Sequence, residues 1–542
     1  MRALKFDNNL VYIILLSLLA LIVYLIFPFR QVQLAEGGRV IFNSPDETAN
    51  FVFANQFAKF GELQLAPKAE YHVPEIHPRS VTVISGNYVP TSFIGMPVLF
   101  GGIAKLAGIK SIIFLTPILS AITLVFFYLL LRKIFSEPIA IVSTIMLAAL
   151  PPYVYYTARS MFHNVLFLDL LIISLYFLVS YIKELKLISL FFGVLLLAAS
   201  IVIRPSEVLW VLPLFLALLF VFKSRVRVNL AIFLFAVLGF LVYMPVFYYQ
   251  TSLYEIPVAT GYPGDPIAEA VEASHDGGIT ATALAFINQS IFPFGIHPKR
   301  AALTFYHYFV DFFWWLAIPV ILGSWWFVRK QENAAPRVYF HAWIWPSLFL
   351  ILFYGSWIIK DTVSPSLYTI GTSYVRYLLP VYVFSIPIAA FVLIKASQVI
   401  PYRRIGTTLV ISFIMIYLTF STIVTFTGGN ESLISVDDAV GAFYTKAKLT
   451  RSVVEPSAVI VAEKTDKIFW PEYDVMSSIF DDATRSSLRD IATKRPVYYY
   501  TFLNQADLAE VNSRLASSTV QLVDPINIFE NENIYKIVPL ES

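Results

Sequence analysis

Two adjacent carboxylates, Asp46 and Glu47, follow soon after the first long apolar run of the 542-residue chain. A carboxylate at a membrane surface could act as a general base and take the proton of an acceptor hydroxyl. The same residues could instead begin a helix over residues 49–60, with Ser44 or Asp46 as its N-cap. Pro45 or Glu47 would then lie in its first turn. Because a dipeptide is a weak motif, these residues alone leave both interpretations open.

Three arginines, Arg159, Arg204 and Arg376, stand at the ends of predicted membrane helices, in connections that are otherwise poor in basic residues. Charged groups near membrane depth are costly and are therefore usually paired or functional. These side chains could reach out to lipid phosphates at the membrane surface. They could also converge on one anionic ligand, since the planar guanidinium fork donates several hydrogen bonds in a geometry that fits a phosphate.

Further polar residues lie close to Arg159 in the sequence. His163 and Asn164 stand at the start of the next predicted helix, and Asp169 lies one to two turns farther into it. A carboxylate within a membrane helix indicates a functional site, and a nearby His or Arg is its expected partner.

A second group of candidates lies near residue 300. His307 and Asp311 have the i, i+4 spacing that places two side chains on one face of a helix. This pair favours a structural hydrogen bond over a proton relay or a metal site, because two ligands are weak evidence for a metal. An amphipathic stretch over residues 283–294 could cover a groove at the membrane surface or simply pack. Three basic residues follow it: His297, Lys299 and Arg300.

The composition places most of the chain in a membrane. Hydrophobic residues make up 58% of it and charged residues only 14%, against roughly 25% charged residues in soluble domains. The net charge of +3 comes from scattered basic residues, so the sequence does not favour nucleic-acid binding. The chain has no cysteine, which excludes disulfides, thiolate metal sites and cysteine nucleophiles.

Eleven apolar runs have roughly the 17–25 residues that a helix needs to cross a bilayer. They cover residues 10–29, 111–131, 138–157, 161–182, 187–203, 206–222, 228–249, 306–328, 338–358, 375–394 and 405–426. The first run is long for a signal peptide and lacks a good cleavage site, so we expect it to remain as a membrane helix. The sequence therefore predicts a mainly α-helical, polytopic membrane bundle.

Basic residues between the runs predict the orientation of this bundle. With eleven spans and a cytoplasmic N-terminus, every inner connection carries Lys or Arg, as the positive-inside rule requires. A further apolar stretch over residues 92–108 would invert most connections if it also crossed, so we expect it to lie along the interface. The outer segments of this multi-pass protein of the cell membrane are then residues 30–110, residues 250–305 and the C-terminal tail.

The last part of the chain differs from the membrane domain over residues 1–427. Residues 428–542 are richer in charged residues and alternate short β-rich runs with polar helical stretches. Strands are predicted at 459–461, 497–500 and 534–538, and helices at 481–493 and 505–516. These elements predict a small extracytoplasmic α/β domain.

Several motifs occur in a characteristic order along residues 1–430. An outer loop with Pro45-Asp46-Glu47-Thr48-Ala49 precedes a helix that ends in Phe-Gly. It is followed by residues 87–108, residues 151–159, Arg204-Pro205-Ser206 and Arg376-Tyr377-Leu378-Leu379-Pro380. Each motif is loose by itself, but their order resembles the GT-C superfamily of membrane glycosyltransferases, on the branch of the protein O-mannosyltransferases and the lipid A aminoarabinose transferase.

This resemblance implies an inverting glycosyltransferase that uses a sugar on a polyprenyl phosphate at the outer face of the membrane. Asp46 would be the catalytic base or would orient the acceptor, with Glu47 beside it. Arg204 and Arg376, followed by Arg159, would bind the donor phosphate. The acceptor would be a lipid, a glycan or a protein. Membrane lipids would surround the enzyme. The resemblance implies no definite cofactor and leaves a divalent metal open.

The chain departs from the family pattern in two places. The O-mannosyltransferase branch often has a second Asp where this chain has His163 and Asn164. The Lys-Pro-Pro motif on the acceptor side of the family is absent, and a His-Pro-Arg segment ending at Arg79 stands in that region instead. The resemblance therefore makes His163, Asn164, Arg79 and Tyr377 the candidates for the acceptor pocket.

A polytopic transporter or flippase for a lipid-linked or polymeric glycan is the main alternative. Such proteins often have inverted repeats and helices broken at mid-membrane, and the sequence shows neither. The polar candidates cluster at one membrane face rather than along a path, which favours chemistry at a surface. A catalytically inactive relative that only binds glycan or lipid is the third alternative, and radiolabelled sugar transfer would distinguish the three.

Overall fold

The computed structural model describes residues 8–35, 37–68, 73–254, 295–330, 332–359, 368–503 and 505–540. The chain forms two compact units. The first, here called the helical unit, comprises Met1–Pro28, Ile113–Phe247 and Pro266–Ser435. The second, here called the mixed unit, comprises Phe29–Ile112, Tyr248–Asp265 and Val436–Ser542. The division expected at 427/428 followed composition, whereas in the structure the first loop groups with the C-terminal residues.

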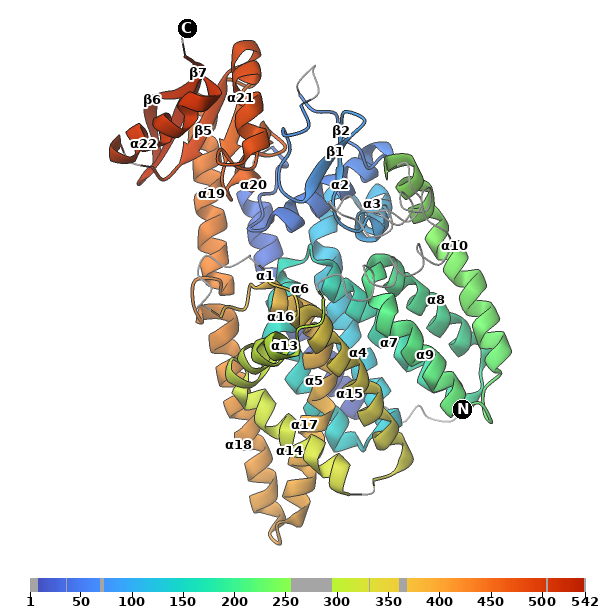
Figure 1. Cartoon of the computed structure of the whole chain (residues 1–542). Helices are drawn as coiled ribbons and strands as arrows, with labels where there is room; N and C mark the ends of the chain where they lie inside the picture. The colour runs from blue at the N-terminus through green and yellow to red at the C-terminus, as the bar shows by residue number, and fades with distance from the viewer. Residues whose placement is uncertain are drawn as a thin grey trace. The chain divides into compact units, whose positions relative to one another are not determined.

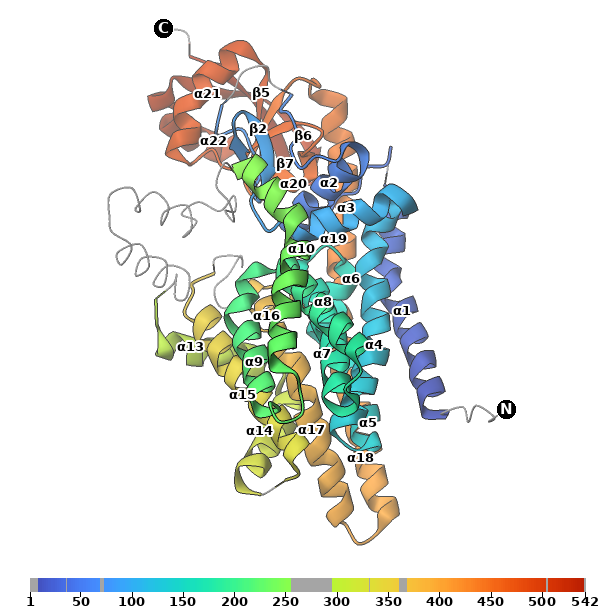
Figure 2. The same ribbon diagram turned by 90° about the vertical axis from the view of Figure 1, so that its right-hand side faces the viewer.

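Helices form the helical unit, and Figures 1 and 2 show its long helices side by side in a roughly common direction. They are apolar on nearly all sides, which is typical of helices in a bilayer. Their bounds are α1 Asn8–Leu34, α4 Leu115–Ile134, α5 Glu137–Ala148, α6 Pro151–Arg159, α7 His163–Glu184, α8 Leu187–Ile203, α9 Val208–Val221, α10 Val228–Tyr254, α13 Pro298–Phe305, α14 Trp314–Arg329, α15 Ala334–Gly355, α16 Ser373–Tyr377, α17 Leu379–Val399 and α18 Arg403–Thr422. Short turns flank some of them: η1 Ile109–Phe114, η2 Pro205–Glu207, η3 Tyr306–Asp311 and η4 Ile423–Thr427.

In the described part of the chain, seven helices are long and apolar enough to cross a membrane, and the number rises to ten if each of three bent pairs is one span. The seven are α1, α7, α10, α15, α17 and two helices extended by flanking turns, Ile109–Ile134 and Arg403–Thr427. The pairs bend by 51° between α5 and α6, by 119° between α8 and α9, and by 109° between Pro298–Asp311 and Trp314–Arg329. The chain is thus a multi-pass membrane protein.

The sequence predicts eleven spans because it takes α8 and α9 as separate crossings, whereas the count of ten takes this bent pair as one span. Arg204 and Pro205 separate these two helices, since a proline removes a backbone donor and clashes with the preceding turn. The hydroxyl of Tyr181, near the end of α7, accepts a hydrogen bond from the backbone N–H of Arg227, which follows α9. The chain therefore leaves this end of the bundle along α8 and returns to it along α9.

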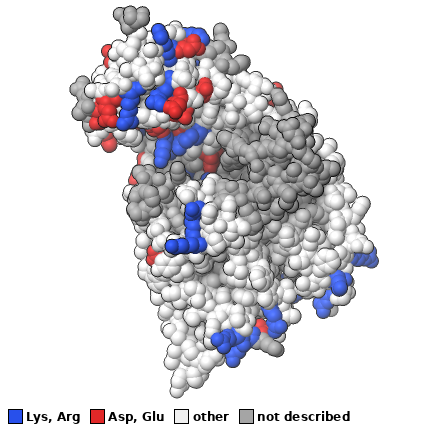
Figure 3. Space-filling model, viewed as in Figure 1, with Lys and Arg blue, Asp and Glu red and all other residues white. Residues whose placement is uncertain are grey.

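Basic connections that the sequence predicts on one membrane side lie close together in the helical unit. Lys133 in the last turn of α4 and Lys186 before α8 both pair with Glu184, at 2.7 Å and 2.8 Å. In Figure 3 the surface of the helical bundle is largely uncharged, whereas the C-terminal α/β domain carries both positive and negative charges. These basic residues thus lie together, as the predicted orientation requires. Which side of the membrane they face stays a prediction.

The mixed unit combines elements of the first loop with the C-terminal α/β domain. The loop forms α2 Pro45–Phe60, β1 Val81–Ile84, β2 Asn87–Pro90 and α3 Gly95–Ala107. The C-terminal part forms α19 Leu433–Val453, β3 Val459–Ala462, α20 Asp466–Phe469, β4 Asp474–Met476, α21 Asp482–Lys494, β5 Val497–Thr501, α22 Gln505–Leu515, β6 Val520–Phe529 and β7 Glu532–Pro539. The small α/β domain predicted from the sequence is confirmed.

The C-terminal sheet has the strand order β4-β3-β5-β7-β6. Strand β3 pairs in parallel with β4 and β5, and β7 pairs antiparallel with β5 and β6. Leu488 of α21 and Val511 of α22 share an apolar cluster with Tyr499 of β5, so both helices cover one face of the sheet (Figure 1). The next residue, Tyr500, points to the other face because side chains alternate along a strand, and it contacts Phe469 of α20 there.

Ser44 is the N-cap of α2, which decides between the two candidates, Ser44 and Asp46, that the sequence offered. Its side chain accepts a hydrogen bond from the Asp46 backbone N–H at 3.3 Å. The Glu47 carboxylate accepts one from the Ser44 backbone N–H at 3.1 Å, which completes a capping box. Gly61 ends the helix with a φ of +76°, a left-handed conformation that glycine adopts without strain. The predicted helix is confirmed, and Glu47 is part of its cap.

Helix α3 lies within the apolar stretch that we expect not to cross the membrane. It has 13 residues, fewer than the roughly 20 that a spanning helix needs. It packs closely on α2 at Gly101, where an added Cβ would lie 2.6 Å from the Ala54 carbonyl oxygen and 2.9 Å from Phe57. Only glycine allows this approach of the two backbones.

Replacing Gly101 by alanine should destabilise the mixed unit, because the new Cβ would clash with the Ala54 carbonyl oxygen. Overpacking of this kind typically costs about 1–3 kcal/mol. The matched control is Gly102→Ala, whose Cβ would meet no atom within 4 Å and which should stabilise α3 by about 0.5–1 kcal/mol. Thermal unfolding of the detergent-solubilised protein should shift in opposite directions, and equal shifts would contradict this packing.

Candidate functional site

Three guanidinium groups meet in the helical unit through two shared aromatic rings. Arg159, the last residue of α6, and Arg376, in α16, both lie over the ring of Phe162. Their Cζ atoms are 4.9 Å and 5.3 Å from its centroid, distances at which a ring face attracts a cation. Arg159 is only 6% exposed, so the contact is largely shielded from solvent.

Tyr377 joins the third arginine to this group. The Cζ atoms of Arg204 and Arg376 lie 5.0 Å and 5.1 Å from the centroid of the Tyr377 ring. The contacts therefore continue from Arg159 through Arg376 to Arg204. The structure brings together the three arginines that the sequence singled out, and we call them the arginine cluster.

The end of α6 positions Arg159. Ser160 follows with a φ of +66°, in a region where residues other than glycine are strained, and the helix stops there. The Arg159 guanidinium donates a hydrogen bond to the Tyr155 hydroxyl at 2.7 Å. The side chain is thus fixed by a residue one turn earlier in the same helix.

Two hydrogen bonds hold the segment that carries Arg376. The Asn164 side-chain amide donates to the Arg376 carbonyl at 3.1 Å, and the Tyr156 hydroxyl donates to the Thr372 carbonyl at 3.0 Å. His163 is buried beside Asn164 in the first turn of α7. Of the candidates for the acceptor pocket, Asn164 and Tyr377 therefore lie at the arginine cluster.

Arg204 has a carboxylate partner that the sequence analysis did not single out. Its Nε donates to Glu207 at 2.5 Å and its Nη2 to the Tyr354 hydroxyl at 2.9 Å. Tyr354 in turn donates to Glu207 at 2.9 Å, and the Trp210 indole donates to the same carboxylate. Arg204 and Glu207 are both buried. The i, i+3 spacing of Arg204 and Glu207 is a sequence signal from which this pair could have been predicted.

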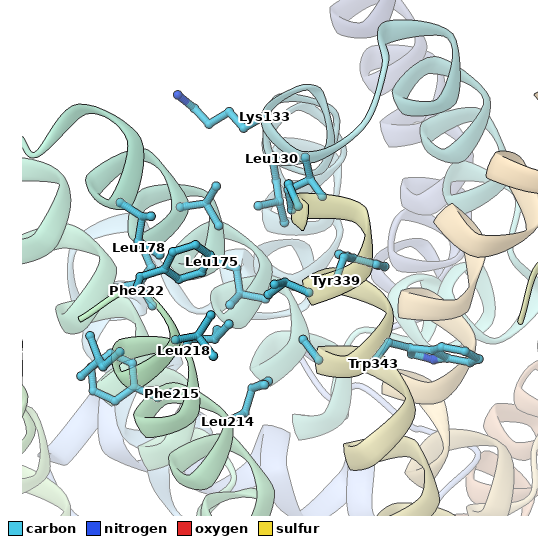
Figure 4. Close-up of a pocket in the computed structure, with 18 of the residues that line it drawn as sticks. Leu130, Lys133, Leu175, Leu178, Leu214, Phe215, Leu218, Phe222, Tyr339 and Trp343 are labelled. Atoms are coloured by element: carbon cyan, nitrogen blue, oxygen red, sulfur yellow. The ribbon is translucent and has the colours of Figure 1, made fainter. Parts of the chain in front are cut away.

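An apolar cavity of about 410 Å³ lies between α4, α7, α9, α15 and α17. Figure 4 shows leucine and aromatic side chains around it, among them Leu214, Leu218 and Phe215 of α9. Trp210 lines the cavity and also contacts Glu207, so the cavity adjoins the Arg204 pair. Arg225, beyond the far end of α9, lines it as well.

Asp169 is fully buried in the helical unit, but its partners differ from the expected His or Arg. Its carboxylate accepts hydrogen bonds from the Ser120 and Tyr153 hydroxyls, both at 2.6 Å. Asp169 lies six positions after His163, so the two side chains point in different directions on a helix with 3.6 residues per turn. Neutral donors from α4 and α6 therefore satisfy this carboxylate.

His307 and Asp311 lie in the π-helical turn η3 rather than in a regular α-helix. No hydrogen bond joins their side chains among the contacts of the described residues, so the expected structural bond is not found. The backbone bonds of a π turn link residues five apart, which changes the spacing that the prediction assumed. The His307 ring instead stacks on Tyr368, with centroids 4.4 Å apart.

The basic residues that precede this turn pack on the end of α15. The His297 backbone N–H donates to the Ser356 hydroxyl at 3.0 Å, and the Arg300 guanidinium donates to the Ser356 carbonyl at 2.7 Å. Lys299 is exposed. The amphipathic stretch predicted at 283–294 lies outside the described residues.

In the mixed unit, Asp46 stands in the first turn of α2, where the helix dipole favours a negative charge. Its carboxylate accepts a hydrogen bond from the Ser80 hydroxyl at 2.5 Å. Glu47 is only 1% exposed and belongs to the capping box. Of the two adjacent carboxylates, Asp46 is therefore the better candidate for chemistry.

Two acidic residues of the C-terminal domain bind the first loop within the mixed unit. Asp466 binds Arg79, the fourth candidate for the acceptor pocket, so that guanidinium is already paired. Asp474 accepts hydrogen bonds from the Tyr88 hydroxyl at 2.9 Å and from Arg495 at 2.8 Å. Burial, followed by the charge of Asp474, raises the pKa of Tyr88 well above its usual value. The Tyr88 hydroxyl is therefore protonated and donates at any physiological pH.

Metal ligands do not gather in the part of the chain that the structure describes. No group of three or more His, Asp or Glu side chains there could hold a metal ion.

The chain has the GT-C fold, as its resemblance implied. A family model described as dolichyl-phosphate-mannose-protein mannosyltransferase matches residues 96–249. The structure of ArnT from Cupriavidus metallidurans in the apo state is similar, with a TM-score of 0.54 and 11% identity. This similarity covers 97% of each chain.

The archaeal oligosaccharyltransferase AglB from Archaeoglobus fulgidus, in complex with an inhibitory peptide and a dolichol-phosphate, is also similar. Its TM-score is 0.51 at 12% identity, over 89% of this chain and 69% of AglB. The oligosaccharyltransferase of the same organism tethered with an acceptor peptide gives 0.52 at 12% identity, over 92% and 72%. No curated protein matches the sequence. At such low identities the similarity establishes the fold.

Replacing Glu207 by alanine should strongly destabilise the helical unit, because Arg204 would stay buried without its carboxylate. Removing one member of a buried ion pair typically costs about 3–5 kcal/mol. The double variant Arg204→Met/Glu207→Leu removes both charges and should recover most of that loss. Thermal unfolding in detergent measures the difference, and a Glu207→Ala protein as stable as wild type would show that the pair contributes nothing.

Proposed function

We propose that this protein is a glycosyltransferase that moves a sugar from a polyprenyl-phosphate-linked donor to an acceptor, with inversion at the anomeric carbon. The observation that carries the proposal is the arginine cluster beside an apolar cavity. A lipid phosphate has both complementary features, an anionic group and an apolar tail. The GT-C fold supports this donor class, and the AglB chain of the same fold was solved with a dolichol-phosphate.

The arginine cluster would bind the donor phosphate, with Arg204 and Arg376 as its main contacts and Arg159 as the third. Negative charge grows on the phosphate as the sugar leaves. Guanidinium groups that are already in place stabilise this charge without reorganising during the reaction. Glu207 contributes by holding Arg204 in one orientation.

The cavity would hold the part of the lipid tail nearest to the phosphate. From Trp210 to Phe222 the wall formed by α9 extends for about 18 Å, at roughly 1.5 Å per residue. Its side chains are mainly leucines and aromatic residues, which favour an isoprenoid chain over water. A tail of several isoprene units fits a wall of this length.

Asp46 would act as the general base in a single displacement. The acceptor oxygen forms a bond to the anomeric carbon while the bond from that carbon to the phosphate oxygen breaks. The electron pair leaves with the polyprenyl phosphate, and the acceptor proton passes to the Asp46 carboxylate. Ser80 orients this carboxylate by its hydrogen bond, and the acceptor is a lipid, a glycan or a protein.

The reaction would take place at the outer face of the cell membrane. Three basic residues lie at one end of the helical unit: Lys133 in the last turn of α4, Lys186 before α8 and Arg227 before α10. By the positive-inside rule this end is cytoplasmic. The N-terminus is then cytoplasmic, and the C-terminal domain is extracytoplasmic.

Replacing Asp46 by asparagine should lower sugar transfer by about 100- to 10,000-fold, the usual contribution of a general base. The assay follows radiolabelled sugar from undecaprenyl-phosphate hexoses and pentoses into products in isolated membranes. Glu62→Gln is the control, since Glu62 is an exposed carboxylate that follows the same helix. Wild-type turnover of the Asp46→Asn protein would remove Asp46 from the mechanism, whereas translocation of the labelled lipid without a new glycosidic bond would identify a flippase.

Replacing Arg376 by alanine should weaken binding of undecaprenyl phosphate. A hydrogen bond to a charged group contributes about 1.5–3 kcal/mol, which corresponds to a roughly 10- to 100-fold rise in Kd. Binding to the purified protein can be measured by native mass spectrometry or fluorescence. Arg337→Ala, at an exposed arginine of α15, should keep the wild-type Kd. An unchanged Kd for Arg376→Ala would mean that this arginine does not bind the phosphate.

A further inference from the structure

A short segment of the C-terminal domain holds the loop that carries Asp46. Asp466, Lys467 and Ile468 are consecutive residues of α20, and each contacts a different point of this loop in the mixed unit. Contacts at several points fix a loop more firmly than one contact would, because each removes part of its conformational freedom.

The first contact joins Asp466 to Arg79. The Arg79 guanidinium donates to one carboxylate oxygen of Asp466 through Nε at 3.0 Å and Nη2 at 2.6 Å. The Arg79 backbone N–H donates to the other oxygen at 2.8 Å. Asp466 is fully buried, so this carboxylate fixes both the backbone and the side chain of Arg79.

The next residue transmits this constraint to Asp46. Ser80 has a φ of +63°, a conformation that costs a non-glycine residue energy and needs support from its surroundings. From this position its hydroxyl donates to the Asp46 carboxylate at 2.5 Å. The chain of contacts thus runs from Asp466 through Arg79 and Ser80 to the carboxylate proposed as the base.

The other two contacts reach the loop on the N-terminal side of α2. The Lys467 ammonium donates to the carbonyl of Asn43, the residue before the N-cap Ser44. The Arg39 guanidinium donates to the Ile468 carbonyl. The segment α20 therefore contacts the loop both before Asp46 and at Arg79, the residue before the Ser80 that binds Asp46.

We propose that Asp466 is a positioning residue for Asp46, and that the C-terminal domain thereby sets the geometry in which the acceptor is activated. This inference rests on the proposed role of Asp46. A displacement of about 1 Å at a reacting group can cost 100-fold in rate. Loss of the Asp466 contact therefore acts on turnover rather than on binding of the lipid donor.

The test compares Asp466→Asn with Glu532→Gln in the full-length protein. Glu532 is a matched control, since it is a buried carboxylate of the same domain that pairs with Lys446 and Tyr500 and has no contact to the Asp46 loop among the described bonds. Arg79→Lys is a milder second variant that keeps the charge but loses the two-point contact. The assay is transfer from undecaprenyl-phosphate sugars, with kcat and the KM for the lipid donor determined separately.

Asp466→Asn should lower kcat by about 10- to 100-fold with an unchanged KM, and Arg79→Lys should lower it less. Glu532→Gln should keep the wild-type kcat even if it lowers Tm as much. Combining Asp466→Asn with Ser80→Ala should cost little beyond either single change, because both act through one contact chain. Backbone hydrogen exchange at residues 43–48 should accelerate in Asp466→Asn and not in Glu532→Gln.

Equal losses of kcat in Asp466→Asn and Glu532→Gln, or fully additive effects with Ser80→Ala, would overturn the positioning role. A rise in KM without a change in kcat would also overturn it. These outcomes differ from a failure of the proposed function. In that case Asp46→Asn itself would keep its activity, whereas failure of the positioning role alone would leave Asp46→Asn inactive.

Discussion

The packing of three guanidinium groups in an apolar helical bundle, with Arg159 and Arg204 buried and Arg376 partly buried, is the constraint on which the candidate donor site depends. A buried charge without a partner costs several kcal/mol, so the surroundings must supply one for each arginine. Phe162 and Tyr377 each offer a ring face to two arginines, and Glu207 supplies a carboxylate to Arg204. Each of the three arginines lies at or next to the end of a helix. Their guanidinium groups are thus already in place to bind an anion with little rearrangement.

Much of the fold could be predicted because its signals are local. The helix after Asp46 has its cap and its terminal glycine within a few residues of its ends. Strand β5 combines Val497 with three tyrosines, which favour extended structure. The pairing of α8 with α9 and the π turn η3 were not evident, because apolar periodicity gives the length of a helix and not its bend. Likewise, β4 has only three residues, too few for a periodic signal.

The candidate site was predictable where basic residues departed from the positive-inside rule. Arg376 stood out because it lies in a connection poor in basic residues, and its place in a family-like motif added weight. Glu207 could have been found from its spacing to Arg204, but Asp466 could not, since it meets Arg79 only through the tertiary fold, 387 residues away. Contacts of this kind depend on how sheet, helix and loop pack, and no local pattern encodes them.

A density map of the full-length protein with bound undecaprenyl phosphate tests the proposed donor site most directly. We expect phosphate oxygens about 2.7–2.9 Å from the Arg376 guanidinium, the usual length of such a charge-assisted bond, and a second contact from Arg204 or Arg159. The lipid tail should pass Trp210 and enter the cavity along α9. A phosphate bound elsewhere, with the arginine cluster not in contact with the lipid, would contradict the proposal.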